Sequence, residues 1–314
     1  MVIAKVVDLT TQAPWMSLFS VTYGAEFPPS TLGAVERVLK SRKGKPRKVV
    51  DVGFLACEHH TYMTVGVAMA APEGAECSVA VIGLGGGGLC VFLQHCFHKV
   101  PLSTGCSAGH ALVHSLPTSG EIRVTAVDID PTILEVATEY FNLVQDERLE
   151  VYIRDGLHFI KQAAEKGSTF EAVLFDVDNK SPSSALSCPP AQFLEEDLLR
   201  QVKTLIGDQG TVRLGAVVWS GVFVLNLVCR MDQVRSNVIS TLSSIFGSVC
   251  SYKLEQEVNE IVFCTNQGPW DQQQWRLGLE EAATKVNSLV KKKKLQSLDL
   301  VTTETFVGSL NVPV

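Results

Sequence analysis

The stretch SVAVIGLGGGG, residues 78–88, joins a short apolar run to a run of glycines. The apolar run is typical of a buried strand, and the glycines predict a tight turn into the following helix. Glycines at this point let the backbone approach a nucleotide at the helix N-terminus. Gly83, Gly85 and Gly88 also fit the GxGxxG pattern, which dinucleotide sites share with S-adenosylmethionine sites. By itself the motif leaves the ligand open.

Strand and helix patterns alternate on the C-terminal side of this turn, which indicates a parallel α/β sheet. Strands are expected within residues 121–130, 148–156, 170–178 and 222–229. The segments 248–256 and 260–266, separated by a short polar turn, predict an antiparallel pair that closes the sheet. We therefore expect an α/β fold with a mostly parallel sheet and a closing antiparallel pair.

Acidic residues follow three further strands at their carboxyl ends. A carboxylate at Asp128 can accept both ribose hydroxyls of a nucleoside, and Asp155 can accept from an adenine amino group, with Gly156 permitting close approach. Asp176 and Asp178 lie over the expected switch point of the sheet, on one side if the strand continues that far. A dehydrogenase uses only the glycine turn and the first acid. The whole set favours an S-adenosylmethionine enzyme or an aminopropyltransferase.

Six motifs together resemble one known family. They are VIGLGGG, AVDIDPTILEVATEYF, RDGLHFI, FDVDNKSPSSALSCPPAQF, VFVLNLVCR and EVNEIVFC. The chain is similar, over roughly residues 50–265, to the C-terminal domain of the methyltransferase-like protein 13 family, which methylates a lysine and the N-terminus of translation elongation factor 1-alpha. The resemblance implies a class I S-adenosylmethionine-dependent methyltransferase (Rossmann-like) fold, related to spermidine synthase. It implies methylation of the N-terminal α-amine, because a separate domain of that family acts on the lysine.

The resemblance also implies a set of cofactor-binding residues. The glycines expected at the methionine end of S-adenosyl-L-methionine are Gly83, Gly85 and Gly87. Asp128 would hold the ribose, and Ile129 would lie beside the adenine. Asp155 and Gly156 would meet the adenine edge, and Asp176 would complete the cofactor site.

Two residues are implied at the acceptor amine, Asp178 of FDVD and Asn259 of EVNE. Transfer to a neutral amine mainly requires orientation of the amine and acceptors for its hydrogen bonds. A carboxylate and an amide oxygen supply these without a metal. We expect no metal site, because His59 and His60 are direct neighbours and should point apart on a helix.

Composition limits the partners and the compartment. The net charge is 27 − 33 = −6, which argues against nucleic acid as a partner. The longest apolar stretch, residues 214–229, is shorter than the roughly 18–20 residues of a membrane span, and we interpret it as a buried strand. Nine cysteines without a CxxC pair indicate free thiols in a reducing compartment. We expect a cytoplasmic protein with no membrane association and a protein substrate, translation elongation factor 1-alpha.

Three segments are expected along the chain. Residues 1–75 form a lead-in, 76–266 the S-adenosylmethionine-binding domain, and 267–314 a polar C-terminal tail. The domain carries two inserts relative to the family, at about 100–121 and 211–221. The first, rich in Gly, Pro and Ser, predicts an exposed loop, and the second an extra strand or a lid.

Two other functions stay open at this point. An aminopropyltransferase acting on a polyamine shares the strand-end acids, although FDVD lacks the extra polar residues expected for a polycation. A catalytically impaired scaffold of the methyltransferase fold is favoured by the two inserts and opposed by the intact strand-end acids.

Overall fold

The computed structural model describes most of the chain. The ranges are 36–39, 47–71, 76–97, 121–179, 185–207, 212–214, 217–219, 221–255, 257–292 and 299–313. Residues 1–35 of the expected lead-in and residues 100–120 of the first expected insert lie outside these ranges.

A nine-stranded sheet forms the centre of the molecule, and its main path runs β13-β11-β12-β10-β6-β3-β4-β5. The parallel strands are β3 (Cys77–Ile82), β4 (Ile122–Asp128), β5 (Leu149–Ile153), β6 (Ala172–Phe175) and β10 (Val222–Cys229). The antiparallel ones are β11 (Ser248–Lys253), β12 (Asn259–Thr265), β13 (Leu310–Asn311) and β7 (Leu186–Cys188), which pairs with β10 off the main path. The predicted α/β fold, with a closing antiparallel pair, is confirmed.

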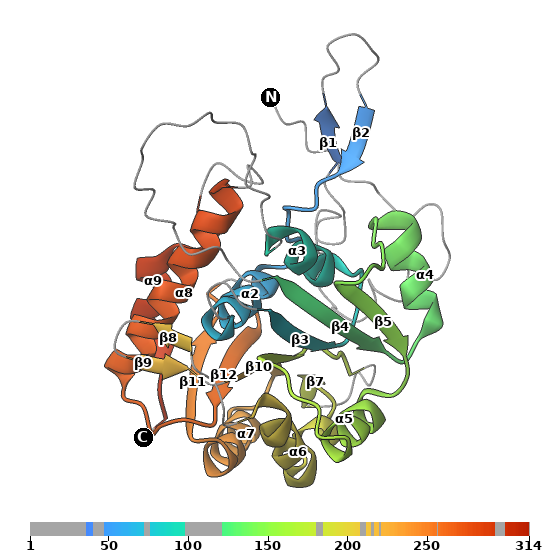
Figure 1. The fold of residues 1–314 in the computed structure, drawn as a ribbon. Coiled ribbons are helices and arrows are strands. Elements are labelled where there is room, and N and C mark those ends of the chain that lie inside the picture. The colour runs from blue at the N-terminus through green and yellow to red at the C-terminus, as the bar shows by residue number, and fades with distance from the viewer. Residues whose placement is uncertain are drawn as a thin grey trace.

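Helices cover both faces of this sheet (Figure 1). One face carries α2 (Glu58–Ala70), α3 (Gly88–Cys96), α4 (Pro131–Tyr140), α8 (Gln272–Lys292) and α9 (Thr303–Gly308). The other carries α5 (Gly156–Glu165), the short 3-10 helix η4 (Ala191–Leu194), α6 (Glu196–Ile206) and α7 (Asp232–Ile245). Alternation along β3 supplies both cores, since Val79 and Val81 pack on the first face and Ala80 and Ile82 on the second.

The order of the strands places a switch point between β3 and β6. β3 has β4 on one side and β6 on the other, with parallel pairing on both sides. Helical connections therefore leave β3 and β6 in opposite directions, and the carboxyl ends of strands at such a point are where open α/β sheets bind ligands. The glycine turn follows β3, and Asp176 follows β6, so the residues predicted for the site meet there.

The C-terminal segment is packed against the first face, so its prediction as a polar tail was wrong. Helix α8 buries Trp275, Leu279 and Val286 completely and packs against α2. The strand β13 then adds to the sheet beside β11. Spacings of four and seven residues put these apolar side chains on one stripe of the helix. Helix α2, flanked by β10 and α8, is in turn buried at every position from Thr61 to Ala70.

Two small strand pairs lie apart from the central sheet. β8 (Val212–Leu214) and β9 (Val217–Trp219) pair antiparallel within the second expected insert, and β1 (Glu36–Leu39) pairs with β2 (Arg47–Val50). The apolar stretch predicted to contain a buried strand ends in β10, which is buried along almost its whole length. Within the described ranges, no helix is both long enough and apolar enough to cross a membrane.

Candidate active site

The turn after β3 has the strained backbone that the glycines predict. Gly83, Gly85 and Gly87 have φ values of 97°, 51° and 75°, which side-chain-bearing residues rarely adopt. A Cβ atom on Gly83 would lie 2.1 Å from the carbonyl oxygen of Asp176, and one on Gly87 would lie 2.7 Å from Leu143 Cδ1. The turn thus needs glycine for conformation and for space, and it begins α3 directly at Gly88.

Asp128 ends β4 and holds the glycine turn in place. Its Oδ2 accepts from the backbone N–H of Leu84 at 2.9 Å, and its Oδ1 from that of Asp130 at 3.0 Å. Each carboxylate oxygen has a second lone pair, so the group fits two ribose hydroxyls as well. The next side chain, Ile129, is 67% exposed, which leaves an apolar surface free beside this carboxylate.

Asp155 and Gly156 begin α5. Asp155 is the N-cap residue, and its Oδ1 accepts from the backbone N–H of Leu157 at 2.9 Å. A Cβ atom on Gly156 would lie 2.6 Å from Ile82 Cγ2 and 3.2 Å from the ring of Phe193. Close packing of the helix on β3 therefore requires this glycine. The capping role of Asp155 is an additional finding, and contact of the pair with adenine stays a prediction.

Asp176 is the centre of a largely but not fully buried polar cluster, which we call the Asp176 cluster: Asp176, His59, His60, Asn226 and Asn259. Asn226 Nδ2 donates to Asp176 Oδ1 at 2.8 Å, and His60 Nε2 lies 2.8 Å from Asp176 Oδ2. Burial by itself would raise the pKa of Asp176, but His59 and the hydrogen bonds from both histidines hold it well below its ordinary value. Asp176 is therefore ionised and engaged by protein side chains, while its predicted contact with a cofactor is untested.

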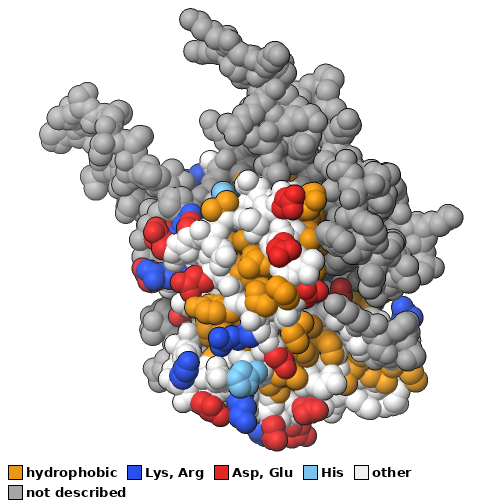
Figure 2. Space-filling view, turned by 90° about the vertical axis from the view of Figure 1, so that its right-hand side faces the viewer, with side chains coloured by type: hydrophobic (Ala, Val, Ile, Leu, Met, Phe, Trp, Pro, Cys, Tyr) orange, Lys and Arg blue, Asp and Glu red, His pale blue; other side chains and the backbone are white. Residues whose placement is uncertain are grey.

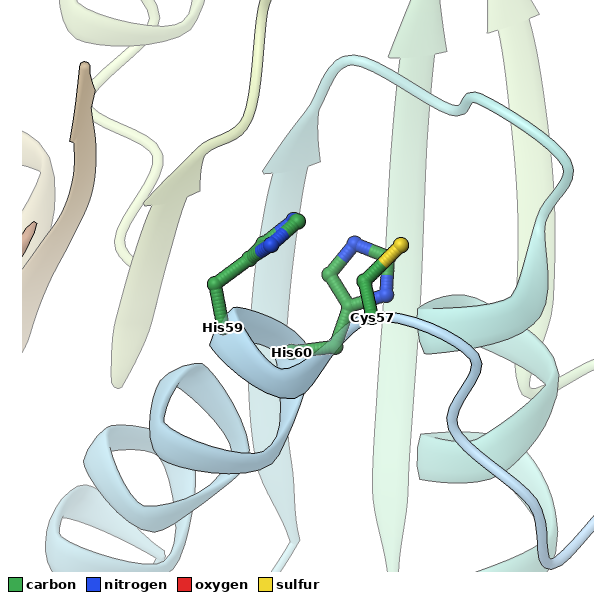
Figure 3. A group of neighbouring side chains, drawn as sticks. All are labelled: Cys57, His59 and His60. Carbon is green, nitrogen blue, oxygen red and sulfur yellow. The ribbon is translucent and has the colours of Figure 1, made fainter. Parts of the chain in front are cut away.

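The two histidines of the cluster converge, contrary to the expectation that neighbours on a helix point apart. They lie in the first turn of α2, and their ring centroids are 4.4 Å apart (Figure 3). His59 Nε2 lies 3.7 Å from Asp176 Oδ1, and His59 Nδ1 lies 3.5 Å from Glu257 Oε2. Burial opposes protonation of His59, but these two carboxylates raise its pKa to about 10. Burial lowers the pKa of His60, with the positive His59 beside it.

Asn226 and Asn259 extend the cluster across β10 and β12. Asn226 is 2% exposed and is the only polar residue of β10. Asn259 is the first residue of β12, and its Nδ2 donates to Asn226 Oδ1 at 2.9 Å. Because the amide nitrogen of Asn259 is used in this bond, its carbonyl oxygen has capacity to accept from a ligand. Sequence reasoning selected Asn259 and missed Asn226 and His60.

Asp178 lies just beyond β6, in the segment that leads to β7. The strand ends at Phe175, so the condition for Asp176 and Asp178 to share one side by alternation is not met, and Asp178 is exposed. The next residue, Asn179, binds β7 through its backbone N–H, which donates to Ser187 O at 2.7 Å. Partial desolvation by the surrounding chain, together with the charge of Asp176, raises the pKa of Asp178 to about 6. The negative field at this point suits a cationic or hydrogen-bond-donating ligand.

Several known proteins are similar to this chain in sequence. The eEF1A lysine and N-terminal methyltransferase homolog of Drosophila melanogaster is 40% identical over 285 residues, 89% of this chain and 37% of that protein. The eEF1A lysine and N-terminal methyltransferase of Xenopus laevis is 37% identical over 251 residues, 76% of this chain and 32% of that protein. The chain thus spans about a third of the length of these relatives.

A solved structure supports the same relationship. The crystal structure of human methyltransferase-like protein 13 in complex with SAH is 30% identical to this chain, with a TM-score of 0.57. The match covers 73% of this chain and 92% of the other. The resemblance inferred from the motifs and the methyltransferase fold are both confirmed. The model of the spermine/spermidine synthase domain matches residues 59–252, more than half of the sequence, and the chain therefore belongs to the spermine/spermidine synthase domain family as a homologue of the eEF1A lysine and N-terminal methyltransferases.

Proposed function

We propose that this chain is an S-adenosyl-L-methionine-dependent protein methyltransferase that acts on the N-terminal α-amine of translation elongation factor 1-alpha. One observation carries the proposal. At the switch point, the glycine turn at Gly83 is in backbone contact with Asp176, whose carboxylate is linked through Asn226 to Asn259. A nucleoside-binding turn and a set of acceptors for an amine are thus joined. The relatives named for eEF1A methylation support the choice of substrate.

The residues at the turn fit the cofactor. The turn from Gly83 to Gly87 has no room for a side chain on Gly83, because a Cβ atom there would lie 2.1 Å from Asp176 O, and Asp128 retains lone pairs for two hydroxyls. When bound, S-adenosyl-L-methionine supplies a methyl group on a positively charged sulfur. Ile129 offers an exposed apolar surface for the adenine, and Asp155 lies one strand further along at the end of β5.

Methyl transfer requires a neutral acceptor amine whose nitrogen lies in line with the bond that breaks. An α-amine with a pKa near 8 is about one tenth neutral at pH 7, whereas a lysine near 10.4 is far more rarely so. In our proposal, the carboxylate of Asp178 and the amide oxygen of Asn259 accept from the two amine hydrogens and direct the nitrogen lone pair at the methyl carbon. The new N–C bond replaces the S–C bond, and the methylated amine then loses a proton to solvent. Asn226 and His60 act as positioning residues because each hydrogen-bonds to Asp176.

Aminopropyl transfer to a polyamine is the second candidate, favoured by the family model that matches the chain. Both chemistries need the nucleoside site and differ in the donor and the acceptor. The purified chain is incubated with either S-adenosylmethionine or its decarboxylated form, and with either the substrate protein or putrescine. Methylated protein with S-adenosylmethionine supports the proposal. An aminopropylated polyamine without protein methylation contradicts it.

The surface and the cysteines bear on partners and compartment. On the face beside β5 and α4, Lys and Arg side chains of the described surface lie among Asp and Glu rather than in one basic patch (Figure 2). This supports a protein substrate over nucleic acid. The eight cysteines within the described ranges are all free. We propose a cytoplasmic location because free thiols persist in a reducing compartment.

A further inference from the structure

Cys57, His59 and His60 bring a thiol and two imidazoles together at the start of α2 (Figure 3). One donor atom of each residue lies within 4.8 Å of the donor atoms of the other two. The side chains of the two histidines are only 15% and 17% exposed, so the group is largely shielded from water. Thiolate sulfur and imidazole nitrogen are the donors that zinc prefers in proteins. The proposed methyl transfer uses neither Cys57 nor the imidazole of His59 directly.

A fourth donor of suitable chemistry lies beside this cluster. The two carboxylate oxygens of Asp176 are 2.8 Å from His60 Nε2 and 3.7 Å from His59 Nε2. Zinc bonds of about 2.0–2.3 Å in a tetrahedron put neighbouring donor atoms roughly 3.5 Å apart. The separations between Asp176 and the two histidines therefore differ from this spacing by less than an ångström. A metal ion would take the place of the protons that the imidazoles share with the carboxylate.

The charge around the cluster also suits a cation. The carboxylates of Asp176 and Glu257 both lie within 4 Å of the histidine rings. Two carboxylates at this point attract a dication, and a bound zinc ion deprotonates a coordinating thiol outright. Glu257 Oε2 is 3.5 Å from His59 Nδ1 and can fix the orientation of that ring through this nitrogen. Carboxylates do the same for metal-bound histidines.

We propose that Cys57, His59 and His60, with Asp176 as the fourth donor, form a binding site for a divalent ion of the zinc class. Metal binding itself does not depend on the proposed methyl transfer. If that function holds, an ion in this site withdraws Asp176 from its contact with Asn226 and inhibits the transfer. The site would then make the enzyme sensitive to free zinc.

Binding is measured on the full chain, freed of metal and kept reduced, without cofactor or acceptor. Zn²⁺ is titrated against a chromogenic chelator, and Co²⁺ is added separately to observe the thiolate-to-cobalt charge-transfer absorption. We expect one ion per chain and a charge-transfer band. Cys57→Ser should abolish the band and weaken Zn²⁺ binding about tenfold or more, since a hydroxyl is a poor zinc ligand. Cys229→Ser is the matched control, because Cys229 is another partly exposed free thiol, whose Sγ donates to Met231 O at 3.3 Å.

Two further variants cover the case in which Cys57→Ser does not fold. They are His59→Gln and His60→Gln, and circular dichroism confirms the folding of each. Both should weaken Zn²⁺ binding as Cys57→Ser does. Failure of the wild-type chain to bind Zn²⁺ at micromolar concentration would overturn the proposal. So would a charge-transfer band that survives in Cys57→Ser but disappears in Cys229→Ser. Because neither assay involves a methyl group, the result is independent of the outcome for the proposed function.

Discussion

Replacing Asn226 by alanine removes the link between Asp176 and Asn259. Asn226 is 2% exposed, donates to Asp176 Oδ1 at 2.8 Å and accepts from Asn259 Nδ2 at 2.9 Å. A hydrogen bond to a charged group contributes about 1.5–3 kcal/mol and a neutral one about 1 kcal/mol. We therefore expect Asn226→Ala to lower the free energy of unfolding by about 2–4 kcal/mol.

The same change should lower methyl transfer by about 100-fold, because the acceptors for the amine lose their fixed positions. The affinity for S-adenosylmethionine should change little, since the hydrogen bonds of Asn226 go to Asp176 Oδ1 and Asn259 Nδ2 rather than to the glycine turn or Asp128. Unfolding in urea, calorimetric titration of the cofactor and single-turnover methylation give the three quantities, all measured well below the melting temperature of the variant.

Asn287 offers a matched control in another part of the core. It is 7% exposed, its Nδ2 donates to Val301 O at 2.9 Å, and its Oδ1 accepts from Leu300 N at 2.8 Å and Val301 N at 3.0 Å. Asn287→Ala should therefore cost similar stability, but it should leave the turnover of the folded protein unchanged. Equal loss of turnover in both variants, or full turnover in Asn226→Ala, would refute the positioning role.

Three further substitutions test other parts of the account. Asp128→Ala should weaken S-adenosylmethionine binding at least tenfold, because two charge-assisted hydrogen bonds of about 1.5–3 kcal/mol each are lost. Unchanged affinity of a folded variant, measured by calorimetry, would show that Asp128 does not hold the ribose. Asp178→Asn should reduce methyl transfer about 100-fold with little change in cofactor affinity, and a parallel fall of both quantities would instead place Asp178 in the cofactor site. Glu260 is 2% exposed, and its carboxylate accepts from Arg235 Nε and Nη2, both at 2.5 Å. Burial by itself would raise the pKa of Glu260, but these bonds lower it overall. The pair therefore stabilises the fold above the ordinary pKa of a glutamate, and this contribution is lost as the pH falls through the lowered value. In Glu260→Gln the melting temperature should therefore fall less steeply as the pH is lowered into the acid range. The same acid dependence of the melting temperature in both proteins would count against the pair.

Local signals in the sequence were enough for the succession of strands along the chain and for the glycine turn. A run such as SVAVI followed by glycines specifies a strand and a sharp turn within a dozen residues, and Gly83 and Gly87 have the positive φ values that this requires. Asp128 and Asp176 are both at strand ends because an apolar strand stops where its backbone leaves the core. These features depend on neighbours in the chain and can be read directly.

The partners of Asp176 could not be read in this way. His60 and Asn226 are 116 and 50 residues distant from it in the chain, and only the strand order brings them together. A signal was present for Asn226, because a single amide inside an otherwise apolar strand needs a buried partner. The stripe of α8 was also readable at Trp275 and Leu279, but the surrounding Gln and Lys residues gave the segment a polar composition.

The most direct measurement of the central claim compares two forms of translation elongation factor 1-alpha, one with a free N-terminal α-amine and one with that amine acetylated. Each is incubated with the purified chain and S-adenosylmethionine, and the methylated positions are located by mass spectrometry of the peptides. We predict methyl groups on the α-amine of the free form and none on the acetylated form. Methylation of the acetylated protein at a lysine, or no methylation of the free form by a folded chain that binds the cofactor, would contradict the account.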